Sequence, residues 1–508
     1  MQTDKTLLDR LIRVTYHYTM QKLHQLNFEN TFARLPDTFH TRLNPTPLPD
    51  PYLVSFNAGA ASLIDLDSAE ASCANFAEHF IGNRLLPGAE PLSMLYAGHQ
   101  FGQFVPQLGD GRAILLGEIR NYAGELWDVQ LKGAGITPYS RQGDGRAVLR
   151  SCIREYLCSE AMHGLGIPTS RALCIVGSDE KVYRETIETA AVLTRLAPSH
   201  VRFGSFEVFF YRGQHEHIAT LADYVIARHF PHLADDADKY QLFLNEVTQR
   251  TTKLMAQWQA VGFSHGVMNT DNMSILGLTF DYGPFGFMET YDPGYICNHS
   301  DPGGRYAYDQ QPQIGLWNLA CLAQALSPLI PIENIHAVLN GYAPAYYQHY
   351  VELMGGKLGL THANKDDFPL IDALLKMMRA SQLDYTNLFR GLGNFNSAVD
   401  TKNDSLRDQF IDRAAFGAWA STYRARLQHE PGTDSERKAR MDAVNPKYIL
   451  RNYLAQNAIE QTEKNRDFTE IDRLLNLLGK PFDEQPEMDS YAATPPEWAR
   501  QIEVSCSS

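Results

Sequence analysis

Long apolar runs are missing from this 508-residue sequence. No stretch of about 18 uninterrupted apolar residues occurs, so we expect no membrane-spanning helix. The N-terminal segment also lacks the apolar core and small-residue cleavage site of a secretory signal, and acidic residues begin at Asp4. Both absences predict a cytoplasmic protein that has no membrane partner.

An excess of basic residues is missing as well. Lys and Arg number 45 against 59 Asp and Glu, which gives a net charge of −14. Because contacts with nucleic-acid phosphates need a basic surface, this balance excludes a general nucleic-acid-binding protein. It does not restrict a nucleotide site, which needs only a few local cations.

Paired cysteines are the third absence. The seven cysteines contain no Cys-x-x-Cys pair and no zinc-like spacing, so we expect most of them to be small buried residues in a reducing compartment. Cys506 differs because it is the third residue from the end, where a thiol is exposed and available for redox chemistry. The alternative is that Cys506 is an incidental thiol.

The chain is long enough for more than one structural unit. Residues 1–90 form an N-terminal extension rich in aromatics and prolines, and residues 91–213 change to strands and glycine turns. Helical patterns dominate 214–400 and continue through a C-terminal extension, 401–508, in which Asn445-Pro446 is the expected start of a helix. The order of these patterns predicts an α+β fold with a strand-rich lobe followed by a helical lobe.

The polar residues of Phe263–Glu289 are the candidate catalytic segment. His265 is followed by Asp271-Asn272, a short apolar hairpin and then Asp281-Tyr282-Gly283. Two carboxylates and a carboxamide are ligands that suit a divalent cation bound to a polyphosphate. The alternative is that these residues form two tight turns, which is a common use of Asp, Asn and Gly.

The pentapeptide Gly-Asp-Gly-Arg-Ala occurs twice, and both copies are candidates for phosphate binding. The first copy contains Gly109, Gly111 and Arg112, and the second contains Asp144 and Gly145. Glycine lets backbone N–H groups approach phosphate oxygens closely, although most such loops only make turns. A helix is expected to start at Asp144 or Gly145 and to run to about His163, with Leu149, Ile153, Tyr156 and Leu157 on its packed face.

Lys132 and Glu155 have the order of two protein-kinase residues. Lys132 ends a predicted strand, and Glu155 follows 23 residues later on the predicted helix. In kinases the carboxylate holds such a lysine against the nucleotide phosphates. Arg195 and Arg202 also suit phosphate contact, although two arginines near a turn are more often surface charges.

The catalytic loop of kinases supplies a second comparison. His265 and Asn272 have the kinase spacing, but Val267 occupies the position of the catalytic base and cannot accept a proton. Asp281-Tyr282-Gly283 is similar to the metal-binding Asp-Phe-Gly turn. These residues predict a protein-kinase-like fold that lacks the usual base, so an ordinary kinase reaction is not expected.

At these residues the sequence resembles the selenoprotein O family, called YdiU in bacteria. The matching motifs extend over nearly the whole chain: GDGRAILLGEI, WDVQLKGAGITPYSRQGDGRAVLRS, REYLCSEAM, VMNTDNMSILGLTFDYGPFGFM, NPKYILRNYL and the terminal CSS. The resemblance implies an enzyme that transfers AMP, with UMP as an alternative, from the nucleoside triphosphate to hydroxyl side chains of proteins. It also implies that the nucleotide binds in the opposite orientation to that in kinases.

The resemblance further implies a role for each matching residue. Asp271 is the expected general base, and Asn272 and Asp281 are the expected ligands of magnesium or manganese. The expected nucleotide contacts are Gly109, Gly111, Arg112, Lys132, Asp144, Gly145, Arg195, Arg202 and Asp281, with Glu155 paired to Lys132. A disulfide between Cys297 and Cys506 is a further hypothesis. A phosphotransferase with another base and an inactive ATP-binding scaffold are the competing interpretations.

Overall fold

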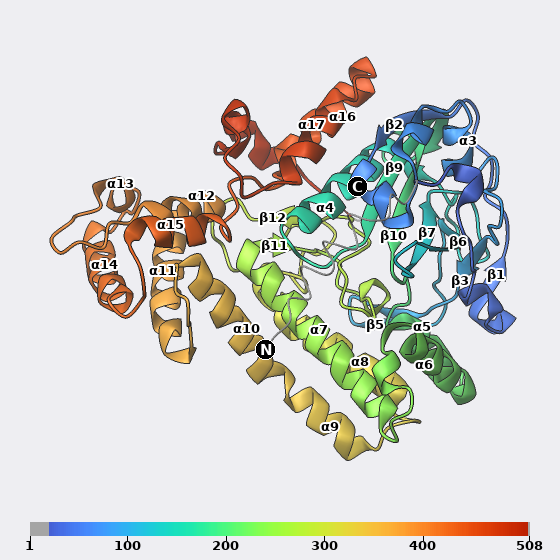
Figure 1. The fold of residues 1–508 in the computed structure, drawn as a ribbon, viewed down its shortest axis with the longest axis horizontal. Coiled ribbons are helices and arrows are strands. Elements are labelled where there is room, and N and C mark those ends of the chain that lie inside the picture. The colour runs from blue at the N-terminus through green and yellow to red at the C-terminus, as the bar shows by residue number, and fades with distance from the viewer. Residues whose placement is uncertain (1–19, 506–508) are drawn as a thin grey trace.

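A computed structural model describes residues 20–505 and shows a strand-rich N-terminal part followed by a helical C-terminal part. In Figure 1 the strands, blue to teal, gather on one side of the molecule, and the helices of residues 239–442, lime to orange, occupy the middle and the other side. This arrangement confirms the coarse order of strands and helices expected from the sequence. In the described part, no helix is long and apolar enough to cross a membrane.

One β-sheet with strands of different lengths forms the core of the N-terminal part. Its strands follow the order β1-β3-β6-β7-β10-β9-β2, and β8 pairs with β10. Two strands from the predicted N-terminal extension join its edges, β1 beside β3 and β2 beside β9. The strand bounds are β1 His40–Arg42, β2 Tyr52–Phe56, β3 Leu92–Met94, β6 Ala113–Arg120, β7 Leu126–Lys132, β8 Ala147–Val148, β9 Arg171–Tyr183 and β10 Ile187–Ala197.

The β6–β7 hairpin and helix α4 place the strand lysine and the helix glutamate. β6 and β7 pair antiparallel around the turn at residues 121–124, as the sequence predicts. The packed face expected for α4, Leu149–Gly164, is also confirmed, because Ile153, Tyr156 and Leu157 are all buried. The predicted start of this helix at Asp144 or Gly145 is wrong, because β8 pairs with β10 and keeps the backbone extended up to Val148.

Helices make up the C-terminal part. The bounds are α5 Gly204–Tyr211, α6 His215–His229, α7 Lys239–Val261, α8 Gln311–Leu326, α9 Ile332–Asn340, α10 Tyr342–Lys357, α11 Phe368–Ser381, α12 Tyr385–Gly391, α13 Asp404–Arg407, α14 Arg413–Leu427, α15 Asp434–Asp442, α16 Asn452–Asn465 and α17 Thr469–Leu478. Two short helices, α2 Ala58–Ala61 and α3 Phe76–Phe80, lie in the N-terminal part. The change from strands to helices falls between the end of β10 and the start of α5.

Helix α7 leads the chain into the candidate catalytic segment. It ends at Gly262, whose φ of 72° is the left-handed conformation that glycine adopts at helix ends. The chain then forms β11, Phe263–Ser264, which pairs with β12, Gly286–Phe287, and so closes the segment into a loop. This pairing holds residues 265–285 beside the sheet.

The helix expected from Asn445-Pro446 begins seven residues later, at Asn452, so that prediction is wrong. The preceding Arg451 is extended, with a ψ of 144°. Its buried guanidinium forms ion pairs with Glu289 and Asp384, which lie on the helical part. These tertiary ion pairs fix the backbone before the helix and override its local start signal.

Candidate active site

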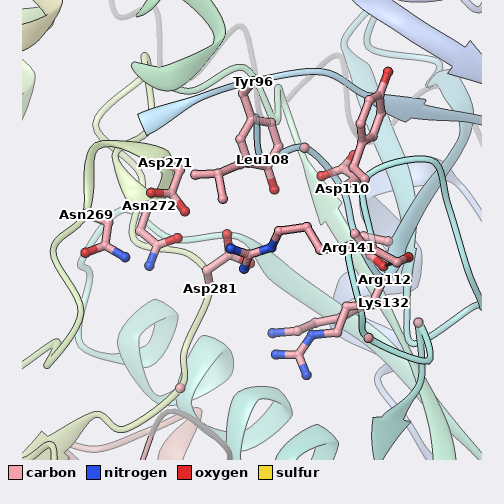
Figure 2. A pocket seen from close by; sticks show the side chains of 18 of the residues that line it. Tyr96, Leu108, Asp110, Arg112, Lys132, Arg141, Asn269, Asp271, Asn272 and Asp281 are labelled. Carbon is pink, nitrogen blue, oxygen red and sulfur yellow. Dashed lines mark hydrogen bonds between the residues drawn. The ribbon is translucent and has the colours of Figure 1, made fainter. Parts of the chain in front are cut away.

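A cavity of about 580 Å³ lies between the sheet and the catalytic segment. Figure 2 shows Asp271, Asn272 and Asp281 on one side of it, with Arg112, Lys132 and Arg141 on the other. The predicted site residues that line the cavity are Gly109, Gly111, Arg112, Lys132, Asp144, Gly145, Arg195, Arg202, Asp271, Asn272 and Asp281. Residues up to 172 positions apart in the chain therefore meet around one volume.

Lys132 and Glu155 form a buried ion pair at the back of this cavity. Lys132 is the last residue of β7, and its Nζ donates a hydrogen bond to Glu155 Oε2 on α4. Only 10% of the lysine side chain and 1% of the glutamate side chain are exposed. Burial lowers the pKa of Lys132, while the charge of Glu155 opposes that shift. The alternative of a surface lysine and a solvated glutamate is wrong.

Asp281 lies between two buried arginines. Its Oδ1 accepts a hydrogen bond from Arg195 Nη1 at 2.5 Å, and its Oδ2 accepts one from Arg202 Nη1 at 2.6 Å. Each arginine side chain is only 2% exposed, so neither is an ordinary surface charge. Although burial alone would raise the pKa of Asp281, Arg202, Arg195 and Lys132 hold it well below its usual range. These three cations therefore favour the ionised form of Asp281.

The two arginines also connect Asp281 to the surrounding structure. Arg195 Nη1 donates to Glu155 Oε1 at 3.1 Å, so one guanidinium joins the lysine–glutamate pair to Asp281. Arg202 Nη1 donates to the main-chain carbonyl of Asp271 at 2.5 Å. The Arg202 guanidinium also lies 4.5 Å from the centre of the Tyr96 ring and 4.6 Å from that of Phe280. These contacts hold Arg195, Asp281 and Arg202 next to one another along one wall of the cavity.

Asp271 lines the cavity and is itself mostly buried. It lies in a single 3-10 turn, Thr270–Asn272, and its Oδ2 accepts a hydrogen bond from Gln100 Nε2 at 3.2 Å. Its Oδ1 is buried and has no hydrogen-bond partner in the described part of the chain. Burial raises the pKa of Asp271 to about 7. A carboxylate of this basicity, with one uncommitted oxygen, can accept a proton from a bound hydroxyl.

The chain between Asn272 and Asp281 does not form the expected hairpin. Ser274 instead pairs with Arg202, and Thr279 pairs with Thr169, so each side of the segment bonds to a different neighbour. The first of these bridges draws Arg202 beside the catalytic loop. Asp281 itself has a φ of 58°, an uncommon conformation for a residue other than glycine, and such strain is often found at functional sites.

The histidine of the kinase-like pattern is structural. His265 is buried, stacks on Trp258 and contacts the carbonyl oxygen of Phe280 through Nε2 at 3.0 Å. Burial lowers its pKa, which favours the neutral imidazole. Val267 lines the cavity, and its carbonyl oxygen accepts a hydrogen bond from Asn272 Nδ2 at 3.0 Å. The position of the kinase base therefore offers the cavity no titratable side chain.

Both Gly-Asp-Gly-Arg loops line the cavity. Gly145 has a φ of 70° and packs so closely on Gly135 that an added Cβ would lie 2.1 Å from its carbonyl. Asp144 is bound by Arg184 at 2.7 Å and so holds its own loop in place. The sequence prediction omitted the Asp110 side chain, which is buried and accepts hydrogen bonds from Met94 N and Gln130 Nε2.

Other cavity residues were also missed by the sequence prediction. They include Tyr96, Gln100, Asp110, Arg141, Arg184 and Asn269. Asp110 lies within the repeated pentapeptide, and Arg141 lies between its two copies, so the repeat itself was an available signal for both. Tyr96 and Gln100 precede the pentapeptide without any motif, and only the fold brings them to the catalytic loop.

The donor set of the cavity fits a hard divalent cation. Asp271, Asn272 and Asp281 contribute oxygen atoms to one wall, and magnesium and manganese prefer oxygen ligands. The carboxylate of Asp271 receives one side-chain hydrogen bond among the described residues, from Gln100, so its negative charge favours a cation in this wall. The residues therefore fit the metal expected from the sequence.

The predicted disulfide involves one residue outside the described part of the chain. Cys297 is buried, and its thiol contacts the carbonyl oxygen and the hydroxyl of Ser264 at 3.5 and 3.4 Å. Burial raises the pKa of Cys297 to about 12, so the thiol form dominates. Cys506 lies outside the described residues, and its pairing with Cys297 stays a prediction.

Comparisons with known proteins agree with the resemblance seen in the motifs. The family described as protein adenylyltransferase SelO matches residues 22–478. A protein nucleotidyltransferase YdiU from Thiobacillus denitrificans is 60% identical over 489 residues, covering 96% of this chain and 100% of that protein. The namesakes from Myxococcus xanthus and Pseudomonas fluorescens are 57% and 54% identical, again over 96% of this chain and 100% of their own length.

Proposed function

Because the chain belongs to the family of the protein adenylyltransferase SelO, we propose that its cavity transfers AMP from ATP to Ser, Thr or Tyr hydroxyls of proteins. UTP is the alternative donor. The main support from the geometry is that the carboxylate residue Asp271 lines the same cavity as Lys132, Arg195 and Arg202. Asp271 can accept a proton, while Lys132, Arg195 and Arg202 neutralise phosphate charge.

The chemistry is a substitution at the α-phosphorus. The acceptor hydroxyl gives its proton to the carboxylate of Asp271, and its oxygen forms a bond to the α-phosphorus. The bond from that phosphorus to the α,β-bridging oxygen breaks, and its electrons leave with pyrophosphate. General-base assistance of this kind contributes about 10²–10⁴-fold in rate.

The leaving group determines what the cations must do. Pyrophosphate carries the charge of two phosphates, and preorganised positive groups lower the barrier to its departure. Lys132, Arg195 and Arg202 are held in place by Glu155 and Asp281 before any nucleotide binds, so no reorganisation is needed. Backbone N–H groups of the loops containing Gly109, Gly111 and Arg112, and Asp144 and Gly145, are the proposed additional phosphate contacts.

Asn272 and Asp281 are the proposed metal ligands. A magnesium or manganese ion bound there supplies positive charge to phosphate oxygens and favours the ionised form of Asp271. The arginines that already pair with Asp281 keep its carboxylate ionised and oriented. Its negative charge also attracts a cation into an otherwise basic cavity.

We also propose that the fold is protein-kinase-like, with lobes at 91–213 and 214–400 and with extensions at both ends. The buried pair of Lys132 and Glu155 supports this assignment, as do Asn272 and Asp281 at the kinase spacing. The same pair is the observation that favours the runner-up function, transfer of the γ-phosphoryl group. Val267 speaks against it, because the kinase base is absent.

The released product distinguishes these functions. The purified chain is incubated with ATP, a divalent cation and casein as a generic acceptor, and pyrophosphate and ADP are both quantified. AMP transfer releases pyrophosphate in step with modified acceptor, and Asp271→Asn abolishes that release. ADP in step with modified acceptor would favour the phosphotransferase, and binding of ATP with neither product would favour an inactive scaffold.

A further inference from the structure

The carboxylate of Asp271 is oriented by a hairpin that the proposed mechanism does not otherwise use. This hairpin consists of β4, Gly98–Gln100, and β5, Gln103–Val105, and it lies over the catalytic loop. We propose that Gln100 is a positioning residue that fixes the orientation of the Asp271 carboxylate for the acceptor hydroxyl. The inference rests on the proposed role of Asp271 as the general base.

Gln100 and Asp271 form a single, specific contact. Gln100 Nε2 donates to Asp271 Oδ2 at 3.2 Å, and among the described residues no other side chain donates to this carboxylate. The side-chain amide of Gln100 makes no other hydrogen bond within the described chain. The other oxygen, Oδ1, is buried against Gly98 of the same strand, so β4 contacts both oxygens of the carboxylate.

Hydrogen bonds fix the β4–β5 hairpin to the catalytic loop, so Gln100 can hold the Asp271 carboxylate in one orientation. His99 N donates to Thr270 Oγ1 at 2.7 Å, and the same hydroxyl donates to Glu207 Oε2 at 2.6 Å. The other oxygen of Glu207 contacts His99 Nδ1 at 3.0 Å, and the Glu207 side chain is fully buried. The residues on either side of the Gln100–Asp271 contact are therefore fixed to each other through one carboxylate on α5.

The tip of the hairpin is held from a second direction. Phe101 N donates to Asn269 Oδ1 at 3.2 Å and to Tyr306 Oη at 2.9 Å. Phe101 has a φ of 51°, an unusual conformation for an aromatic residue, and these bonds maintain it. Gln100 thus lies between two anchored neighbours, His99 and Phe101, and its side chain has little freedom to leave the cavity wall.

Close packing at Gly98 brings β4 directly against Asp271. A Cβ added to Gly98 would lie 2.8 Å from Asp271 Oδ1, closer than real Cβ contacts. The backbone of β4 therefore rests directly on the carboxylate, and Gln100 supplies the polar contact from the same strand. The Asp271 side chain is therefore enclosed by the backbone of β4 and the side chain of Gln100.

Loss of this hydrogen bond would change the orientation of the base and leave nucleotide binding intact. The terminal torsion of an aspartate is broad, so a carboxylate without its donor samples other angles. Small misplacements of a catalytic group cost up to about 10²-fold in rate. Among the described residues Gln100 forms no hydrogen bond with Lys132, Arg195 or Arg202, so kcat should fall while ATP affinity stays constant.

The test compares Gln100→Met with Gln103→Met. Methionine has a similar length and no donor, and Gln103 pairs opposite Gln100 in the same hairpin but is exposed and does not line the cavity. Initial rates of AMP transfer to casein and equilibrium ATP binding are measured for both variants and for Asp271→Asn. We expect about a tenfold lower kcat for Gln100→Met, unchanged ATP affinity and wild-type behaviour of Gln103→Met.

Further variants keep the outcomes distinct. Gln100→Glu should lower kcat more than Gln100→Met, because a second carboxylate would face Asp271 without donating. A kcat of Gln100→Met within twofold of wild type, or equal losses in both methionine variants, would overturn the positioning role. If Asp271→Asn stays active, Asp271 is not the base, and the positioning role of Gln100 fails with that assignment. If Asp271→Asn is inactive but Gln100→Met is unaffected, only the positioning role of Gln100 fails.

Discussion

Replacement of Asp281 by asparagine should separate the structural from the catalytic role of its carboxylate. The side chain accepts hydrogen bonds at 2.5 and 2.6 Å from Arg195 and Arg202, whose side chains are 2% exposed. An amide of the same shape keeps one acceptor oxygen and turns an N–H₂ group toward the second guanidinium. Breaking a buried charge pair in this way costs about 3–5 kcal/mol in general.

The surrounding contacts place the expected cost at the lower end of that range. Arg195 retains Glu155 and Gln130 as acceptors, and Arg202 retains the carbonyl oxygen of Asp271. We therefore expect the free energy of unfolding to fall by about 3 kcal/mol. Urea unfolding measures it, with Asp366→Asn as the matched control because that carboxylate is exposed.

The same variant should lose transfer but bind ATP more tightly without metal. Removal of a negative charge beside Arg195 and Arg202 favours a polyphosphate, and we expect about tenfold higher affinity in the presence of a chelator. Transfer should fall by at least about 10³-fold, since a charged group at the reacting phosphate is lost. A variant that is as stable as wild type, and that retains transfer within tenfold, would refute this account of Asp281.

Three further predictions concern the cavity and the helical part. Lys132→Met should lower kcat/KM by about 10²-fold, because a cation that faces the phosphates is lost. The fold should persist, because Glu155 retains Arg195 as a partner. A kcat/KM within threefold of wild type in steady-state assays would contradict this. Chelation should abolish transfer without changing the urea midpoint, because both Asp281 oxygens are already bound by arginines, and unfolding on chelation would contradict it. Burial lowers the pKa of Lys357 from 10.5 to about 7, so the unfolded chain binds one more proton between these values and stability rises with pH there. Lys357→Met should remove that rise. Between about pH 7.5 and about pH 9.5, the free energy of unfolding of wild type should therefore increase by about 3 kcal/mol relative to that of the variant. Parallel pH profiles of the two proteins would exclude the effect.

Local signals in the sequence were enough to predict some elements of the site. The alternation and turn residues around Asn121 predict the β6–β7 hairpin, which ends at Lys132. The helical period that includes Ile153 and Tyr156 predicts the buried face of α4 and therefore the direction of Glu155. Each of these features depends on residues close together in the chain.

Features that depend on distant parts of the chain could not be predicted. α4 starts at Leu149 because β8 pairs with β10, and α16 starts at Asn452 because Arg451 binds two distant carboxylates. The contact of Gln100 with Asp271 spans 171 positions and leaves no periodic signal. Burial of Arg202 follows from a bridge to Ser274 that no local propensity encodes.

The central claim is that the α-phosphorus, and not the γ-phosphorus, is the reacting atom. ATP labelled at the α-phosphate and ATP labelled at the γ-phosphate are supplied in separate reactions with the chain, a divalent cation and casein. The account predicts label on protein only from the α position, and loss of that label in Asp271→Asn. Label that reaches protein only from the γ position would contradict it.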